Sequence, residues 1–292
     1  MLKRIISSFQ FRFPDLAAKL FDETPLLEVS ELNSAASLST WEHRIPNHVY
    51  LSWSAGNKFG KTHAGELKAF RNRNLDCHFH LYNSSMRDAY MEEHYASHPI
   101  LSIYKSAKAG AMKVDIWRYC ILYERGGFYF DINKCIEVPL SQYVLPNDFA
   151  LLSYEKNILV NILAKEKQAR LPLILPLKSE VLLQFTDRPL LNWGLGSVSG
   201  HAVFGKAIEN IVNYAPHFKG KYFRNMSEPI MELTGPIMFT RAFYDCLRER
   251  VPFSARQCGI DFDGLGNPNM NGGWVRYTIG KSYKHKKNTT IL

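Results

Sequence analysis

The sequence predicts an α/β fold, in which helices flank a β-sheet, and three observations support this prediction. Short runs rich in β-branched and aromatic residues, such as HVYLSW at 48–53, are bounded by turn residues and predict strands. Longer stretches with helical spacing of their apolar residues separate these runs. Polar or aromatic residues directly follow several of the runs, and ligands of α/β sheets bind beyond the carboxyl ends of the strands.

The first half of the chain alternates between the two types of element. In chain order, the pattern predicts a strand at 48–53, a helix at 61–75, a strand at 77–82, helices at 86–96 and 107–124, and a strand at 127–132. Gly126 and Gly127 supply the stop between the last helix and the last strand. Trp53, Asn83 and Asp131 stand at the predicted strand ends, where a ligand is expected.

The second half is less regular. Apolar runs at 149–163 and 173–185 suit strands, 201–215 suits a helix, 232–250 suits a turn followed by a helix, and 259–273 suits a loop because it is rich in Gly, Asn, Asp and Pro. Residues 1–44 predict an N-terminal helical extension. The expected organisation is therefore this extension followed by a single domain at 45–292.

Composition limits the class of protein. The 292 residues are 46% hydrophobic and 13% aromatic, which is typical of a globular chain that buries a core. The formal net charge of +9 suits phosphate groups on nucleic acid, on an anionic membrane or on a nucleotide-sugar. Because the sequence has no RNP, zinc-finger or helix-turn-helix signature, we expect no nucleic-acid partner.

The cysteines and the chain start suggest a compartment. An odd number of cysteines, five, without C-x-x-C spacing favours reduced thiols in a cytoplasm over a disulfide framework. No run approaches the roughly 20 apolar residues of a membrane span, and MLKRIISSFQFRF lacks the features of a signal peptide. That start is nevertheless basic with helical apolar spacing. It predicts either a helix packed on the domain or a peripheral contact with the inner membrane surface.

The stretch AGAMKVDIWRYCILYERGGFYFDIN at 109–133 carries the chemistry. Asp115 and Arg118 lie three residues apart on one helix face. Side chains alternate along the following strand, so Asp131 and Asn133 share a face near its end. Such oxygens can hold Mg²⁺ or Mn²⁺, or a ribose hydroxyl, while Asp115 and Arg118 reach a sugar and a phosphate. The simpler alternatives are a surface ion pair and a polar strand end leading into a loop.

This stretch resembles the family 32 glycosyltransferases, the group with a sugar-binding region containing a DXD motif, and more distantly the glucosyltransferase domain of large clostridial toxins. The matching residues are Asp115, Arg118 and Tyr119 on the helix, Gly126 and Gly127 at the break, and Tyr129 and Asp131 on the strand. Asn133 departs from the pattern, because the family has a second acid there and this chain has the variant Asp-Ile-Asn.

The resemblance implies a GT-A fold, a Rossmann-like mixed sheet flanked by helices that binds a nucleoside-diphosphate sugar. It assigns 45–140 to the nucleotide-sugar and 141–292 mainly to the acceptor. It implies that Trp53 stacks on the nucleobase and that His285 contacts phosphate. Asp131 and Asn133 would hold Mn²⁺ or Mg²⁺, more weakly than two acids would. No residue is identified as a nucleophile.

The function implied is transfer of a sugar, with retention, to a glycan or lipid-linked acceptor in surface polysaccharide or lipopolysaccharide synthesis. Two alternatives stay open. Asn133 favours a weakly active or inactive protein of the same fold that binds a nucleotide-sugar or glycan. The likeness to the toxins favours a transferase that modifies a protein.

Overall fold

A mixed β-sheet organises the molecule. The computed structural model describes residues 16, 19, 20, 27, 28, 33–38, 40–53, 58–156, 188–268, 270 and 289–292. Within these residues the main sheet has six strands in the order β4-β2-β5-β8-β7-β9. The strands are β2 His48–Ser52, β4 His78–Tyr82, β5 Gly127–Asp131, β7 Ala150–Tyr154, β8 Gly194–Ser197 and β9 Arg256–Ile260. In this sheet only β8 runs antiparallel to its neighbours, so β2, β4, β5, β7 and β9 all end at one common edge.

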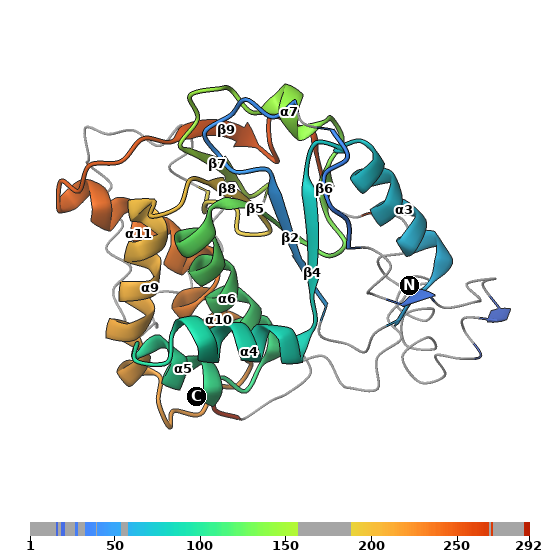
Figure 1. Cartoon of the computed structure of the whole chain (residues 1–292). Coiled ribbons are helices and arrows are strands. Elements are labelled where there is room, and N and C mark those ends of the chain that lie inside the picture. Colours follow the sequence, from blue (N-terminus) through green and yellow to red (C-terminus); the bar gives the residue numbers. More distant parts are fainter. Residues whose placement is uncertain are drawn as a thin grey trace.

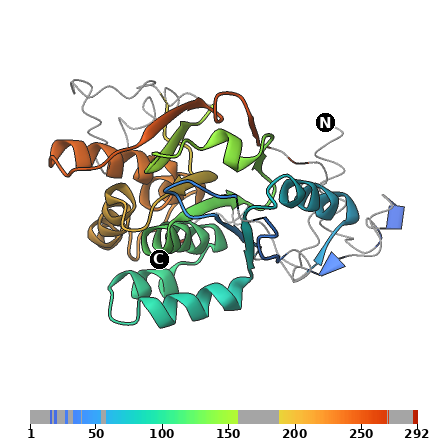
Figure 2. The ribbon, with the colours of Figure 1, turned by 45° about the horizontal axis from the view of Figure 1, so that its top comes forward.

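Helices cover both faces of this sheet, as the sequence predicts (Figure 1). The larger layer contains α4 Ser84–His94, α5 Ile100–Ser106, α6 Gly110–Arg125, α9 Ala202–Tyr214, α10 Ser227–Leu233 and α11 Pro236–Arg248, with the short 3-10 helix η2 Ala215–His217 following α9. The other face carries α3 Lys61–Asn72 and α7 Leu140–Tyr143. Figure 2 shows α3 on the opposite side of the sheet from the helices of the larger layer. The α/β fold class with a mixed sheet is therefore confirmed.

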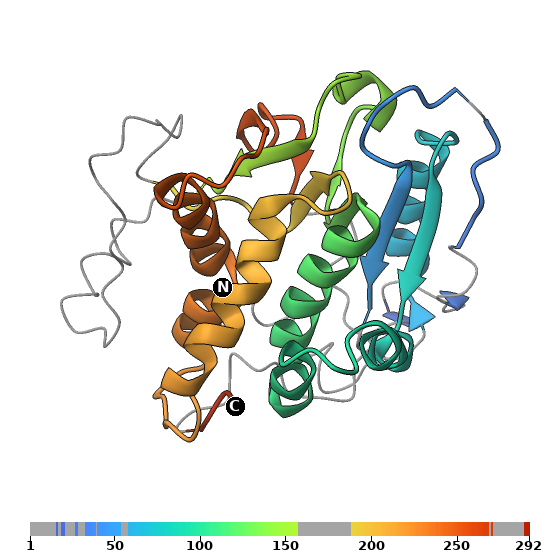
Figure 3. The ribbon, with the colours of Figure 1, turned by 60° about the vertical axis from the view of Figure 1, so that its left-hand side comes forward.

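Alternating side chains of the strands feed two separate cores. Tyr129 of β5 packs into the core under the larger helical layer, whereas Phe128 and Phe130 pack into the core that contains Phe70 of α3. In the first core α6, α9 and α11 pack side by side, which Figure 3 shows. Trp117 of α6 is completely buried there. The helix that carries Asp115 and Arg118 is thus fixed against the sheet by apolar contacts.

A single residue, Gly126, separates α6 from β5, and this short connection sets the geometry of the site. Gly126 has φ +66° and Gly127 has φ +96°. A Cβ on Gly127 would lie 2.5 Å from the carbonyl oxygen of His48, which is closer than any side chain tolerates. Glycine is required here because it adopts positive φ without a steric penalty and lets β5 pair closely with β2.

Several elements differ from the sequence-based expectation. The helices α5 and α10 are absent from the predicted pattern. The end of β9 overlaps the start of the loop expected at 259–273. The loop prediction also overlaps the short pair between β6 Cys135–Ile136 and β10 Gly266–Asn267. The expected strands at 173–185 and the end of the run at 149–163 lie outside the described residues.

The N-terminal region is described only in part. β1 Leu27–Glu28 pairs with β3 Lys58–Phe59, and Ser34 pairs with Phe79 at the edge of β4. These contacts join part of the 1–44 range to the domain, while residues 1–15, which include the basic start, lie outside the described residues. In the part of the chain that the structure describes, the helices are too short or too polar to cross a bilayer.

Candidate functional site

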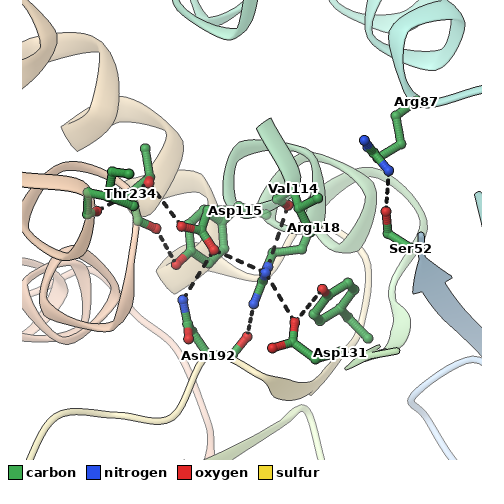
Figure 4. A network of polar contacts seen from close by, with 11 residues as sticks. Ser52, Arg87, Val114, Asp115, Arg118, Asp131, Asn192 and Thr234 are labelled. Carbon is green, nitrogen blue, oxygen red and sulfur yellow. Dashed lines mark hydrogen bonds and ion pairs between the residues drawn. The ribbon is translucent and has the colours of Figure 1, made fainter. Parts of the chain in front are cut away.

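Arg118 lies between two carboxylates at the edge of the sheet where the parallel strands end. Its Nη2 is 3.0 Å from Oδ1 of Asp115 and 3.3 Å from Oδ1 of Asp131. Figure 4 shows the guanidinium between these two side chains, which come from α6 and from the end of β5. The predicted convergence of residues 115, 118 and 131 is therefore present in the structure. One guanidinium is therefore shared by two acids.

Asp115 is held by residues from distant parts of the chain. Its Oδ2 accepts a hydrogen bond of 2.9 Å from the Thr234 hydroxyl, and its Oδ1 accepts one of 3.4 Å from the Asn192 amide. The carbonyl oxygen of Asn192 also accepts a hydrogen bond from Arg118. Asp115, Arg118 and Thr234 are all buried, so this part of the network is rigid rather than exposed to a ligand.

Asp131 is the exposed member of the network. Its side chain is 32% exposed, compared with 5% for Arg118 and 8% for Asp115. The Tyr129 hydroxyl donates a hydrogen bond of 2.6 Å to Asp131, and the Tyr129 ring lies 4.2 Å from the Arg118 guanidinium carbon. Tyr129 therefore supports both charged groups. A ligand at this edge would meet Asp131 first.

Burial and neighbouring charges shift the pKa values of Asp115 and Arg118 in opposite directions. Burial raises the pKa of the Asp115 carboxyl, and the neighbouring Arg118 guanidinium and Thr234 hydroxyl oppose that rise by stabilising the carboxylate. Burial would lower the pKa of Arg118, but Tyr129 and the two carboxylates outweigh it and raise that pKa. Arg118 is therefore protonated, and it is the fixed positive charge around which the site is built.

The Asp-Ile-Asn segment does not continue the strand as expected. β5 ends at Asp131, and the amide of Lys134 donates a hydrogen bond of 2.9 Å to the Asp131 carbonyl, which closes a turn. The prediction that Asn133 shares a strand face with Asp131 rested on alternation up to residue 133, and that premise is wrong. Asn133 is half-buried, and its carbonyl accepts a hydrogen bond of 2.9 Å from the amide of Met270.

Further charged residues gather at the same edge, and sequence reasoning did not select them. Glu155 directly follows β7, which is parallel to β9, and Asp261 directly follows β9. Burial raises the pKa of the Glu155 carboxyl to about 7, with Lys134 opposing the shift and Asp261 and Asp131 adding to it. Their position directly after a strand is the signal that could have identified both acids. Asn192 and Thr234 lack such a signal, because only tertiary packing brings them to Asp115.

The other predicted site residues have different surroundings. Trp53 follows β2, whose last residue is in register with Asp131, and it is buried in the core on the α3 side. Its stacking on a nucleobase stays a prediction. Asn83 caps α4, because its side chain accepts a hydrogen bond of 2.9 Å from the amide of Met86. His285 lies outside the described residues.

The donor set does not fit a two-carboxylate cation site. Of the motif residues only Asp131 is an acid, and its Oδ1 already contacts Arg118 and Tyr129. Asn133 contributes no negative charge, and Mg²⁺ and Mn²⁺ prefer carboxylate oxygens. Among the described residues, no group of three or more His, Cys, Asp or Glu side chains is arranged to hold a metal ion.

A hollow of about 430 Å³ lies elsewhere, at the end of α11. It is lined mainly by apolar residues, including Phe243, Leu247 and Phe253, and by none of the network residues. The candidate site is therefore defined by the charged network at the strand ends.

Three comparisons relate this chain to known proteins. Residues 32–150 match the family described as "Glycosyltransferase sugar-binding region containing DXD motif". A curated relative, the "Initiation-specific alpha-1,6-mannosyltransferase" of Candida albicans, is 23% identical over 222 residues, which are 69% of this chain and 53% of the relative. The chain thus spans about half the length of that relative. A solved structure, "PaToxG Glycosyltransferase", has a TM-score of 0.48 and 12% identity, with coverage of 84% of this chain and 79% of that one.

Proposed function

Because residues 32–150 match the family of glycosyltransferase sugar-binding regions that contain a DXD motif, we propose that this protein transfers a hexosyl group from a nucleoside-diphosphate sugar to a glycan or lipid-linked saccharide. The observation that carries the proposal is the Asp115–Arg118–Asp131 network at the common end of the parallel strands. Ligands of α/β sheets bind at this edge. The Candida albicans relative is named as a mannosyltransferase, so mannose is the first sugar to test.

Each member of the network has a proposed role. Asp131 contacts the sugar donor, because it is the exposed member. Arg118 fixes the orientation of that carboxylate and adds positive charge close to the diphosphate. Asp115 in turn holds Arg118, with Thr234 and Asn192 holding Asp115. Binding energy and fixed charge are the contributions proposed for the protein, and the resemblance to family 32 glycosyltransferases implies retention at the anomeric carbon.

A divalent cation, Mn²⁺ or Mg²⁺, is implied by the family and would offset diphosphate charge when bound. Asp131 is the only motif acid that could contact it, and the residues present do not form a two-carboxylate site. No step of the proposed transfer is assigned to the cation.

The test is release of the nucleoside diphosphate from a panel of UDP- and GDP-sugars, with glycan acceptors present. We expect Asp131→Ala to lower kcat/KM by about 100-fold or more, in line with loss of a group that contacts the reacting substrate. Glu92→Ala is the matched control, because Glu92 is an exposed acid on α4 that pairs with Lys105. Equal activity of Asp131→Ala and the wild-type protein would refute the proposal.

A second function is proposed because of Asn133: a protein of this fold that binds a nucleotide-sugar or glycan without turnover. Calorimetric binding of a nucleotide-sugar without release or transfer over the whole panel would favour this function. Labelling of proteins in a lysate, with no labelling of glycans, would instead favour a protein-modifying transferase.

The biological setting is also a proposal. We place the enzyme in the cytoplasm, in surface polysaccharide or lipopolysaccharide synthesis, with its basic start in contact with the inner membrane surface. Flotation with vesicles that contain anionic lipid tests the contact. Failure of the vesicles to carry the protein would refute it.

A further inference from the structure

The motif of this chain supplies less negative charge than the family pattern, and the adjacent residue is a lysine. Asp131 has its Oδ1 3.3 Å from Arg118 and 2.6 Å from the Tyr129 hydroxyl, and Asn133 is neutral. A divalent cation would therefore find a single carboxylate, Asp131, whose Oδ1 already contacts Arg118 and Tyr129. A site that binds a diphosphate still needs positive charge to offset the charge of the two phosphates.

Lys134 is placed to supply that charge. Because β5 ends at Asp131, the next residues form a turn instead of an alternating strand. The Lys134 amide therefore donates a hydrogen bond to the Asp131 carbonyl. Its Nζ lies 5.0 Å from the centroid of the Trp193 ring. Trp193 itself is joined to Asp131, since its carbonyl accepts a hydrogen bond of 2.8 Å from the Asp131 amide. The Lys134 ammonium thus belongs to the same strand-end edge as Asp131.

Lys134 also interacts electrostatically with two further acids of this edge, Glu155 and Asp261. Its charge lowers the pKa values of Glu155 and Asp261 against the rise that burial causes. Lys156 and Arg188 act on Asp261 in the same way. Several cations therefore lie among half-buried acids at this edge. A diphosphate that binds here can replace the carboxylates as the anion next to these cations. An ammonium on a flexible stem binds phosphate as a point charge with three donors, which suits this exchange.

We propose that Lys134 takes the place of the divalent cation in neutralising the donor diphosphate, so that donor binding by this chain does not require a metal ion. This inference rests on the proposed function, because it assumes that a nucleoside diphosphate binds at the edge. It assigns a binding role to a residue that lies outside the DXD pattern. It also gives a physical reason why an amide at position 133 is compatible with an active transferase.

The test is calorimetric titration of the full chain with UDP and with GDP, in EDTA and in Mn²⁺. For the nucleotide that binds, we expect the wild-type Kd in EDTA to stay within about twofold of its value in Mn²⁺. Lys134→Met should weaken binding in EDTA by about tenfold or more, as expected for loss of a charged hydrogen bond. Lys134→Arg, which keeps the charge, should recover most of the affinity. Lys105→Met is the control, because Lys105 is an exposed lysine on α5 that pairs with Glu92.

The possible outcomes separate the two proposals. Suppose that a nucleotide binds in Mn²⁺ but not in EDTA, and that Lys134→Met does not change its Kd in Mn²⁺. The inference about Lys134 is then wrong, while the proposed function stands. If neither nucleotide binds under any condition, the proposed function fails and the inference fails with it. Thermal unfolding of each variant shows whether a loss of affinity comes from a loss of folding.

Discussion

At the scale of single residues, the site depends on one guanidinium that is shared between neighbours. Arg118 contacts Asp115 and Asp131 through Nη2, and donates to the Asn192 carbonyl through Nη1. Its Nε donates to the Val114 carbonyl at 3.5 Å. These contacts use different nitrogens of one planar group, which a lysine cannot reproduce because it has a single nitrogen. The geometry, and not only the charge, therefore requires arginine.

We accordingly expect Arg118→Lys to lower both stability and activity. The buried Asn192 carbonyl and part of the carboxylate surface would lose donors, which costs about 2 kcal/mol in the free energy of unfolding. Transfer should fall by at least about tenfold, since Asp131 loses its orientation. Chemical denaturation and donor-release kinetics provide the measurements. Arg125→Lys, the same change at an exposed position of the same helix, should stay within about 0.5 kcal/mol; an equal effect of both variants would contradict this account.

At the scale of elements, the short connection between α6 and β5 fixes the distance between Arg118 and Asp131. The helix ends at Arg125 and the strand begins at Gly127, so a displacement at this joint moves the two charged residues relative to each other. Gly126 is equally constrained, because its Cβ would lie 2.7 Å from the amide nitrogen of Ser199. The Gly-Gly break therefore has a positional role in addition to ending a helix.

Gly127→Ala should be strongly destabilising, by about 3 kcal/mol or more, because a side chain at φ +96° would also collide with the His48 carbonyl. Thermal and urea unfolding measure the change. The control is Gly65→Ala in α3, where a Cβ meets no atom within 4 Å, and where alanine should add about 0.5–1 kcal/mol. A Gly127→Ala protein as stable as the wild type would show that β5 can begin elsewhere.

At the scale of the whole molecule, local patterns predicted the first half of the fold and the acidic and basic centre of the site. β2, β4 and β5 were found because their composition and turn residues are local signals. β9 was missed because Arg-Gln-Cys-Gly-Ile has weak strand propensity and gains its place by pairing with β7. Thr234 and Asn192 were not chosen as site residues, because their contact with Asp115 exists only after folding.

The turn after Asp131 is a different case, because its signal was present in the sequence. Asp-Ile-Asn-Lys has Asp at the first and Asn at the third position of a four-residue turn, and both residue types favour turns. The resemblance to a strand motif took precedence over that signal. This is why Asn133 was expected to share a strand face with Asp131, whereas the chain turns there and places Lys134 beside Trp193.

A last consequence concerns the opposite end of the parallel strands, where three half-buried histidines lie together. Nδ1 of His48 is 2.9 Å from Nε2 of His80, and the His48 and His78 rings are 4.9 Å apart. Burial, followed by the charges of His48, His78 and Arg125, lowers the pKa of His80 from 6.5 to about 4. Burial also lowers the pKa of His48.

The sign of the resulting pH dependence follows from proton linkage. Between pH 6.5 and about 4 the unfolded chain binds a proton at His80 and the folded chain does not, so stability is present above pH 6.5 and is lost as the pH falls. Acids such as Glu155 titrate in the same range, so the comparison must be between two proteins. From pH 7.5 to 4.5 the wild-type Tm should fall further than that of His80→Gln, by on the order of 2 °C. Parallel Tm curves would mean that His80 is protonated without cost in the folded chain, and that the stacked histidines at this end of the sheet tolerate a positive charge.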